Sequence, residues 1–587
     1  MKKIMFLLLF HCWVINAQSK YFKKNVFFSD VHSAHKVLSI NDAYVIVGNY
    51  TATDTVKWQS YINAFDKYGN DTWLKKYDFI GSAISTNNLV RTNTGYAFAG
   101  WIYENSLSDT DCFLMQVGEY GSYINLNPVI FEGYSSSLRS LIQTSNNHFL
   151  ATGNVVGDIE TYAHIIKFDE QGDTLWTRIY QDYGASILLN IIESPDQSGY
   201  YACGNANMDF SGNPDQSDIL LLKIDENGTV LWDTIYNPSG NDQAIEMAIT
   251  ADNHLLVAGE RTVNPGTQTR LGLLYKMDLS GNIIWGNNLY AGFYSAVRVL
   301  SDGNYGTCGT IYRSNGLSSY QLDALLVKID AETGNIRWHR SFGSISHQDY
   351  AYDFTPTPDG GFMVVGRMDS TNYAYAYALK LNCMGLLTEP TAAYTYQPQA
   401  DGTGFVSFVN QSQYAYPDSI DGGYYVWDFG DGSPPYLCGQ GYAPCPDVLE
   451  HQYPAQGVFS TTLTAVVCSD TSTAVGLIDS NNATGGVISH VAAPALPQVP
   501  PSGGQGAITV APNPAKEVLH IVRVAAPVAG TFCLYDITGR QATSVLVSAA
   551  AATTSIPLGT LPAGVYVWAF YDLPNQAVQR GKITIIK

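Results

Sequence analysis

A short strand-like unit that ends in glycine recurs seven times along the N-terminal part of the chain. Its copies AYVIVG, GYAFAG, HFLATG, GYYACG, HLLVAG, NYGTCG and GFMVVG end at Gly48, Gly100, Gly153, Gly204, Gly259, Gly309 and Gly366. The spacing of these glycines is nearly constant from one copy to the next. A regular period of this kind indicates one supersecondary unit per repeat, stacked on its neighbours to bury a shared core.

A second unit follows most copies and carries an aspartate and a tryptophan on either side of a turn. It reads, for example, LLLKIDENGTVLW at 220–232. The recurring pairs are Asp66 and Trp73, Asp169 and Trp176, Asp225 and Trp232, Asp278 and Trp285, and Asp330 and Trp338. Each period therefore holds about four short strands, and seven periods predict an all-β, seven-bladed β-propeller over residues 18–388. A β-solenoid or a row of separate sandwiches is the alternative.

The ends of the repeat region predict that the ring closes. The seventh repeat stops after Gly385 without a fourth strand, whereas the chain before the first repeat has a spare strand. Tyr21 lies as far before Gly48 as Trp73 lies before Gly100 (48 − 21 = 100 − 73). We therefore expect the N-terminal strand to complete the last blade, with Tyr21 at the tryptophan position. Closure of this kind removes two exposed sheet edges. A linear array would have no need of such an offset in the N-terminal strand.

The stretch DENGTVLWDTIY at 225–236 fits either a structural turn or a calcium loop. In a turn, Asp225 accepts backbone N–H groups, Gly228 adopts a positive φ, and Trp232 packs between blades. An EF-hand loop needs glycine at position 6 and glutamate at position 12, whereas here the glycine is at position 4 and apolar residues follow. Repetition in five blades favours the turn. No cofactor is predicted, and calcium has no support from the motif.

The segment AETGNIRW at 331–338 and its sister copies resemble the tryptophan repeat of quinoprotein-type (PQQ-like) propellers. Quinoprotein dehydrogenases commonly have eight blades, adjacent cysteines beside the cofactor, and a bound calcium. This sequence has seven repeats and no adjacent cysteines. The resemblance therefore implies the architecture and not the redox activity.

Residues 389–480 lack the repeat and have a different sequence pattern. YVWDFGDGS at 425–433, HQYPAQGVF at 451–459 and the alternating TTLTAVV at 461–467 predict a small β-sandwich. In this order the motifs resemble the PKD domain. Asp428 and Asp431 fit a glycine-containing turn better than a metal site. Cys438 and Cys445 lie close together in an expected loop of an exported chain, which predicts a disulfide.

The C-terminal end indicates an export route. Residues 481–506 are rich in Pro and Gly and read as a linker. The segments APNPAKEVLHI, LYDITGR, LPAGVYV and KITIIK within 507–587 resemble, in this order, the type A sorting domain of type IX secretion. The motif positions are Pro512, Asn513, Pro514, Gly539, Gly564 and Lys587. The resemblance implies passage through the periplasm, the secretion machinery as a partner, and a final place outside the cell or on the outer-membrane surface.

The N-terminus and the charge agree with export. Lys2 and Lys3 precede an apolar stretch and Ala17, which predicts a signal peptide over 1–17 that is too short to span a bilayer. No transmembrane segment is predicted further along the chain. The net charge of −20 and the absence of a basic run argue against nucleic acid as a partner.

Catalytic motifs are missing from the sequence. It contains no H-E-x-x-H, no G-x-S-x-G and no Walker loop, so no catalytic residue is predicted. Arg139, Glu246, Arg298 and Asp353 fall in expected inner strands and are candidate ligand contacts, although they could equally pair with one another. Two hypotheses remain. One is a non-catalytic binding or adhesion protein for glycan or protein. The other is an extracellular polysaccharide hydrolase or lyase with its site in the propeller channel, which two converging carboxylates or a His-Tyr-Arg set would favour.

Overall fold

The structure is a computed structural model, and every regular element in its described residues is a β-strand. It describes residues 20–585 except 27–31, 52–56, 78, 80–81, 105–109, 158–159, 209–216, 238–240, 265–268, 315–319, 345–346, 370–373, 400–402, 418–420, 455–456, 481–484, 490–507, 512–517, 524–529, 536–540, 548–552, 559–560, 562–563 and 573–576. The chain divides into two compact units at Glu389 and Pro390.

The first unit, Ser19–Glu389, consists of antiparallel blades of four strands each. Blades one and two are β2–β5 (His32–Ile40, Ala43–Thr51, Trp58–Asp66, Asp71–Tyr77) and β6–β9 (Ser82–Arg91, Gly95–Glu104, Thr110–Gly118, Tyr123–Val129). Blades three and four are β10–β13 (Ser135–Gln143, Phe149–Val156, Thr161–Phe168, Thr174–Tyr180) and β14–β17 (Ile187–Glu193, Tyr200–Ala206, Asp218–Ile224, Val230–Tyr236).

Blades five and six share one long strand. They are β18–β20 (Asp242–Ile249, Leu255–Asn264, Thr269–Met277) and β22–β24 (Tyr305–Ser314, Tyr320–Ile329, Ile336–Phe342), joined by β21 (Ile283–Val299), which pairs with β20 and then with β22. Blade seven is β25–β27 (Gln348–Pro356, Phe362–Asp369, Ala374–Leu381) together with β1 (Phe22–Val26).

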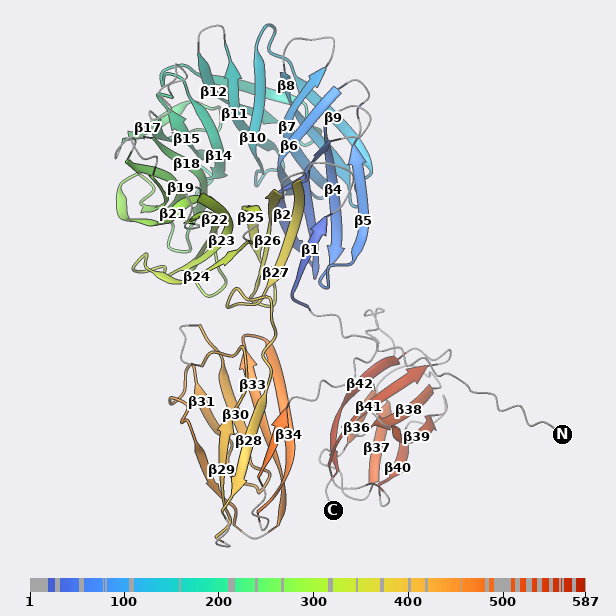
Figure 1. The fold of residues 1–587 in the computed structure, drawn as a ribbon. Helices are drawn as coiled ribbons and strands as arrows, with labels where there is room; N and C mark the ends of the chain where they lie inside the picture. Colours follow the sequence, from blue (N-terminus) through green and yellow to red (C-terminus); the bar gives the residue numbers. More distant parts are fainter. Residues whose placement is uncertain are drawn as a thin grey trace, which may run out of the picture. The chain divides into compact units, whose positions relative to one another are not determined.

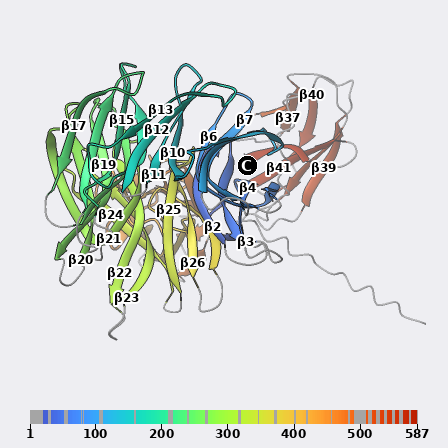
Figure 2. The same cartoon turned by 90° about the horizontal axis from the view of Figure 1, so that it is seen from above.

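These sheets form a closed ring. The first strand of each blade contacts the first strand of the next, from β2 through β6, β10, β14, β18 and β21 to β25, and β25 contacts β2 again. Figure 1 shows the blades around a common axis, and Figure 2 shows the sheets standing side by side when seen at 90°. The prediction of an all-β, seven-bladed propeller is confirmed. The cores lie between blades; one, for example, combines Val47 of blade one with Phe98 of blade two.

The N-terminal strand completes the last blade, as the repeat offset predicted. β1 pairs antiparallel with β27, with Phe22 opposite Lys380. In blades three to six the residue opposite the matching lysine is the tryptophan, as in the pairing of Lys223 with Trp232. Phe22 therefore takes the tryptophan position, and the expectation that Tyr21 takes it is wrong by one position. The segment between the tryptophan position and the repeat glycine is one residue shorter here than in the next repeat (48 − 22 against 100 − 73), so an equal offset selects the neighbouring residue.

A β-bulge explains the glycine that defines the repeat. In all seven blades the pairing of the first and second strands skips one residue of the first strand. The bulge pushes a carbonyl group of the first strand toward the repeat glycine. A Cβ at Gly48 would overlap the carbonyl oxygen of Ser33, and one at Gly259 would overlap that of Gln243. The same close approach recurs at the other five repeat glycines, so a side chain is excluded there.

The glycine turns that follow the third strands join most blades to their neighbours. Asp225 Oδ1 accepts the N–H groups of Asn227 and Thr229, both at 2.8 Å, and Gly228 has a φ of 79°. Matching backbone bonds are made by Asp66, Asp169, Asp278 and Asp330. A Cβ on Gly228 would lie 3.0 Å from the Trp176 ring of the preceding blade. Five further contacts of this kind join consecutive blades: Phe22 with Gly69, Trp73 with Gly121, Trp232 with Gly281, Trp285 with Gly334, and Trp338 with Gly385.

The second unit contains two β-structures, each described here by itself. In the first, one sheet is β32-β29-β28-β35 (Leu449–Gln452, Phe405–Asn410, Ala393–Pro398, Gly486–Ser489) and the other is β31-β30-β33-β34 (Tyr436–Gly439, Tyr424–Asp428, Val458–Val467, Asp470–Asp479). Trp427 is buried between them with Tyr394 and Phe408. Asp428 and Asp431 each accept a backbone N–H within the turn, at 3.0 Å. Cys438 and Cys445 form a disulfide.

The C-terminal β-structure has sheets β36-β37-β40 (Ile508–Ala511, Val518–Arg523, Thr553–Pro557) and β39-β38-β41-β42 (Gln541–Val547, Gly530–Tyr535, Gly564–Asp572, Ala577–Ile585). Gly564 begins β41 opposite Ile585. The other predicted motif positions, Pro512, Asn513, Pro514, Gly539 and Lys587, lie outside the described residues, as do the signal peptide and most of the linker.

Candidate functional site

The bulges place one residue of each blade at the same level of the ring, and six of these seven residues are polar. The residue after each bulge is Lys36, Asn88, Ser140, Asn190, Glu246, Ala296 or Asp353, in blade order. A bulge interrupts the strand ladder and leaves backbone groups without their usual partner. Side chains from the preceding blade supply acceptors here. Asn190 Oδ1 accepts the Met247 N–H at 3.1 Å, and Glu246 Oε2 accepts the Val297 N–H at 2.9 Å.

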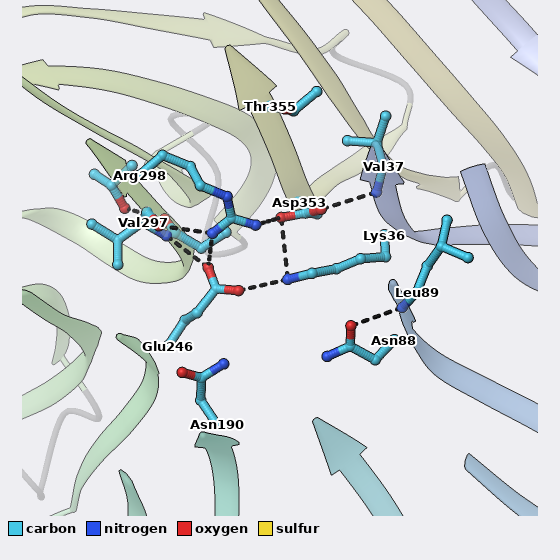
Figure 3. A network of polar contacts seen from close by, with 12 residues as sticks. Lys36, Val37, Asn88, Leu89, Asn190, Glu246, Val297, Arg298, Asp353 and Thr355 are labelled. Atoms are coloured by element: carbon cyan, nitrogen blue, oxygen red, sulfur yellow. Dashed lines mark hydrogen bonds and ion pairs between the residues drawn. The ribbon is translucent and has the colours of Figure 1, made fainter. Parts of the chain in front are cut away.

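Asp353 makes the same kind of bond across the closure of the ring, because its Oδ2 accepts the Val37 N–H at 2.9 Å. Two cations then neutralise the two carboxylates. Lys36 Nζ lies 2.5 Å from Glu246 Oε1 and 3.4 Å from Asp353 Oδ1. Arg298 bonds to Glu246 and lies 2.6 Å from Asp353 Oδ1. Figure 3 shows the four side chains converging, with Lys36 of blade one reaching Glu246 of blade five.

Burial makes this four-charge network strong. The Asp353 side chain is 0% exposed and that of Glu246 is 8% exposed. Burial alone would raise the pKa of Glu246, but Arg298 and Lys36 outweigh it and lower the pKa to about 2. Burial also raises the pKa of Asp353, against the opposing charges of Lys36 and Arg298. Every carboxylate oxygen in the network thus already accepts a bond from a cation or a backbone N–H.

The network contains three of the four predicted contact residues, Glu246, Arg298 and Asp353, but not Arg139. Arg139 is the bulge residue of β10 and is exposed to solvent. Within the described residues its guanidinium makes no hydrogen bond or ion pair. Its charge acts on His35, the bulge residue of β2. Protein atoms around the guanidinium partly desolvate it, and this lowers the pKa of Arg139.

Two further bulge residues accompany Arg139, and sequence reasoning missed both. The ring of Tyr352 in β25 stacks on that of His35, with centroids 5.4 Å apart and planes at 6°. Tyr350 extends the stack at 6.2 Å. The signal was available in the repeat spacing. Arg139 and Tyr352 lie equally far before the glycines of their own repeats, and His35 lies one position nearer to its own (153 − 139 = 366 − 352, against 48 − 35).

Hydrogen bonds define the protonation of His35. Its Nε2 lies 3.2 Å from Asn49 Nδ2, which can only donate, and 2.7 Å from the Ser33 hydroxyl. Nε2 is therefore the unprotonated nitrogen, and the neutral ring carries its proton on Nδ1. Burial, together with the charges of Arg367 and Arg139, lowers the pKa of His35 to about 4. Burial raises the pKa of Tyr352 to about 12, so its hydroxyl keeps its proton.

Around the axis the protein thus presents two different polar groups. We call Lys36, Glu246, Arg298 and Asp353 the ionic network, and Arg139, His35 and Tyr352 the donor cluster. The ionic network is internally saturated. The donor cluster has a guanidinium, an imidazole N–H and a phenol that have no hydrogen-bond acceptor in the described residues.

Among the described residues, no three His, Cys, Asp or Glu side chains gather as metal ligands would. Nor does any helix in the described ranges have the length and hydropathy of a bilayer span.

Solved structures similar to this chain have low sequence identity to it, and two of them are described as β-propellers. The Dos1 propeller is 9% identical with a TM-score of 0.37, over 61% of this chain and 94% of that one. The propeller domain of the Trilobed protease from Pyrococcus furiosus, which has an open velcro topology, is 10% identical with a TM-score of 0.36, over 62% and 97%. A puromycin hydrolase mutant is 11% identical with a TM-score of 0.38, over 60% of this chain but only 52% of its own. No curated protein matches the sequence.

The C-terminal region matches a known family. Residues 509–585 match the family described as "Secretion system C-terminal sorting domain". The predicted export signal is thereby confirmed. The chain carries a type IX secretion C-terminal sorting domain, which directs it out of the cell or to the outer-membrane surface.

Proposed function

We propose that this chain is a non-catalytic binding or adhesion protein, displayed at the cell surface, whose ligand is a glycan or a protein. The observation that carries the proposal is the saturation of the ionic network. A glycosidase needs one carboxyl group to donate a proton and a second to act as base or nucleophile. Asp353 is fully buried, and Glu246 is held between Lys36 and Arg298. Neither carboxyl group is free to act on a substrate.

The same proposal covers the domain organisation. Residues 18–388 are a PQQ-like propeller without redox activity, 389–480 are a PKD domain, and 481–506 link them to the sorting domain at 507–587. The indole-to-glycine contacts between blades support the first assignment. The two four-stranded sheets around Trp427, with the Asp428 and Asp431 turn, support the second.

A second candidate function is a polysaccharide lyase, because His35, Tyr352 and Arg139 form the kind of set that β-elimination uses. A lyase needs a base that removes a proton from the sugar ring. His35 Nε2 is already bonded to Asn49 and Ser33, and Tyr352 is a very weak acid at neutral pH. The set is better suited to donating hydrogen bonds than to taking up a proton, which favours binding.

The experiment is a paired one on the full purified chain. The protein is applied to an array of glycans and extracellular proteins. The same glycans are incubated with the protein and screened for new reducing ends and for unsaturated products. Retention without product is expected. Turnover of any polysaccharide would contradict the non-catalytic proposal and favour the lyase or hydrolase.

A further inference from the structure

We propose that the donor cluster of Arg139, His35 and Tyr352 is a binding site for an acidic sugar, one that carries a carboxylate or a sulfate ester. This inference rests on the proposed binding function and names its ligand class. It concerns residues on three blades that the bulges bring to one level of the ring.

The charge balance selects an anionic ligand. The ionic network contains two cations and two anions, so it has no net charge to offer. Arg139 is different, because it is exposed and none of the described carboxylates lies within ion-pair distance of it. A guanidinium presents a planar fork that matches the two oxygens of a carboxylate or sulfate.

The rings of the donor cluster select a sugar. Three stacked rings run from blade seven to blade one: Tyr350 stacks on Tyr352, and Tyr352 stacks on His35. The Nδ1–H of neutral His35 and the hydroxyl of Tyr352 have no acceptor among the described residues, and sugar hydroxyl and ring oxygens can provide one. On blades four and five the bulge residues are apolar, namely Leu189 and Ile245. A ligand with one charged edge, several hydroxyl groups and an apolar face fits these surroundings.

The net charge of −20 does not oppose this assignment at physiological salt. The Debye length there is about 8 Å, so distant surface carboxylates are screened while direct contacts to Arg139 persist.

The test uses ligands that differ only in charge. A galacturonate hexasaccharide is titrated into the full chain beside its fully methyl-esterified form, with sulfated dextran and dextran as a second pair and an oligoglutamate peptide as the protein-like probe. We expect at least one charged saccharide to bind and its neutral partner to bind about tenfold or more weakly. Equal binding of charged and neutral forms would overturn the inference. Binding of oligoglutamate alone would overturn it in favour of an acidic protein partner.

Matched variants locate the site. Arg139→Gln should weaken binding about 10- to 100-fold, the effect of losing charge-assisted hydrogen bonds. Arg178→Gln removes the same charge from the outer strand of the same blade and should leave affinity unchanged. Tyr352→Phe should weaken binding less than Arg139→Gln, since the ring stack is retained. If Arg139→Gln folds with an unchanged melting temperature and still binds, the site is elsewhere. If no acidic saccharide binds while another ligand is retained on the array, this inference fails and the proposed binding function stands.

Discussion

Replacement of Glu246 by glutamine tests the account of the ionic network, because it keeps the shape and removes one charge. Lys36 and Arg298 would then share only Asp353, and the Val297 N–H could still meet an amide oxygen. The ion pairs lower the pKa of Glu246 from 4.5 to about 2. At 1.36 kcal/mol per pKa unit this is about 3 kcal/mol of stability at pH 7. Removing one partner of a buried pair typically costs about 3–5 kcal/mol, which agrees.

The pH dependence gives the sharper test. Because the folded-state pKa of Glu246 is depressed, its contribution is fully present above about pH 4.5 and is lost as the pH falls toward 2. The difference between wild type and Glu246→Gln should therefore shrink by about 2 kcal/mol between pH 7 and pH 3. Urea unfolding of the full chain, followed by tryptophan fluorescence at both pH values, measures it.

A double variant provides the control. Lys36→Met together with Glu246→Gln leaves Arg298 paired with Asp353, so the charges balance again. Its loss of stability should be smaller than the sum of the two single losses, because the residues share one network. A difference between wild type and Glu246→Gln that is the same at pH 3 and pH 7 would refute the electrostatic reasoning, and strict additivity would refute the network.

Three other outcomes follow from the fold and the export signal. Gly259→Ala should destabilise the propeller by about 3 kcal/mol in the same urea assay, because its Cβ would overlap the Gln243 carbonyl. Gly303→Ala, at a turn with open space, should cost about 1 kcal/mol, and equal losses would argue against the bulge explanation. Deletion of residues 20–26 should open blade seven, lower the melting temperature and promote association through the bare edge of β27; a monomer with unchanged melting temperature would contradict closure. Deletion of 507–587 should retain the protein in the periplasm on cell fractionation, and normal surface display would refute the role of the sorting domain.

The fold was predictable because its repeat is enforced by contacts that leave few options. Gly48 and its equivalents face a carbonyl where no side chain fits, and Gly228 and its equivalents combine a positive φ with a ring from the preceding blade. Such positions mark the period in sequence even when identity between blades is low. The register of β1 was not predictable from spacing alone, since one pairing step separates Tyr21 from Phe22.

The candidate site was less predictable, because it depends on residues that differ between blades. Glu246 and Asp353 could be placed on inner strands, but their pairing with Lys36 crosses from blade five to blade one. No local pattern reports a contact between residues so far apart in the chain. His35 and Tyr352 stack across the ring closure, and neither belongs to a motif. Only an alignment of the blades at their bulges puts these residues at one level with Arg139.

The residue that follows the bulge is an amide in some blades and a carboxylate in others. This difference explains why the ionic network occupies one side of the ring. Asn190 caps the next blade's N–H without charge and needs no cation. Glu246 and Asp353 cap equivalent N–H groups with charged oxygens, and buried carboxylates are tolerated only with counter-charges. Lys36 and Arg298 meet that requirement, and Lys36 thereby ties two blades that are not neighbours. An asparagine could form the same caps, so the carboxylates add the cross-ring tie. Because that tie balances both cations with the two carboxylates, Arg139 is, among the described bulge residues, the cation left available to a ligand.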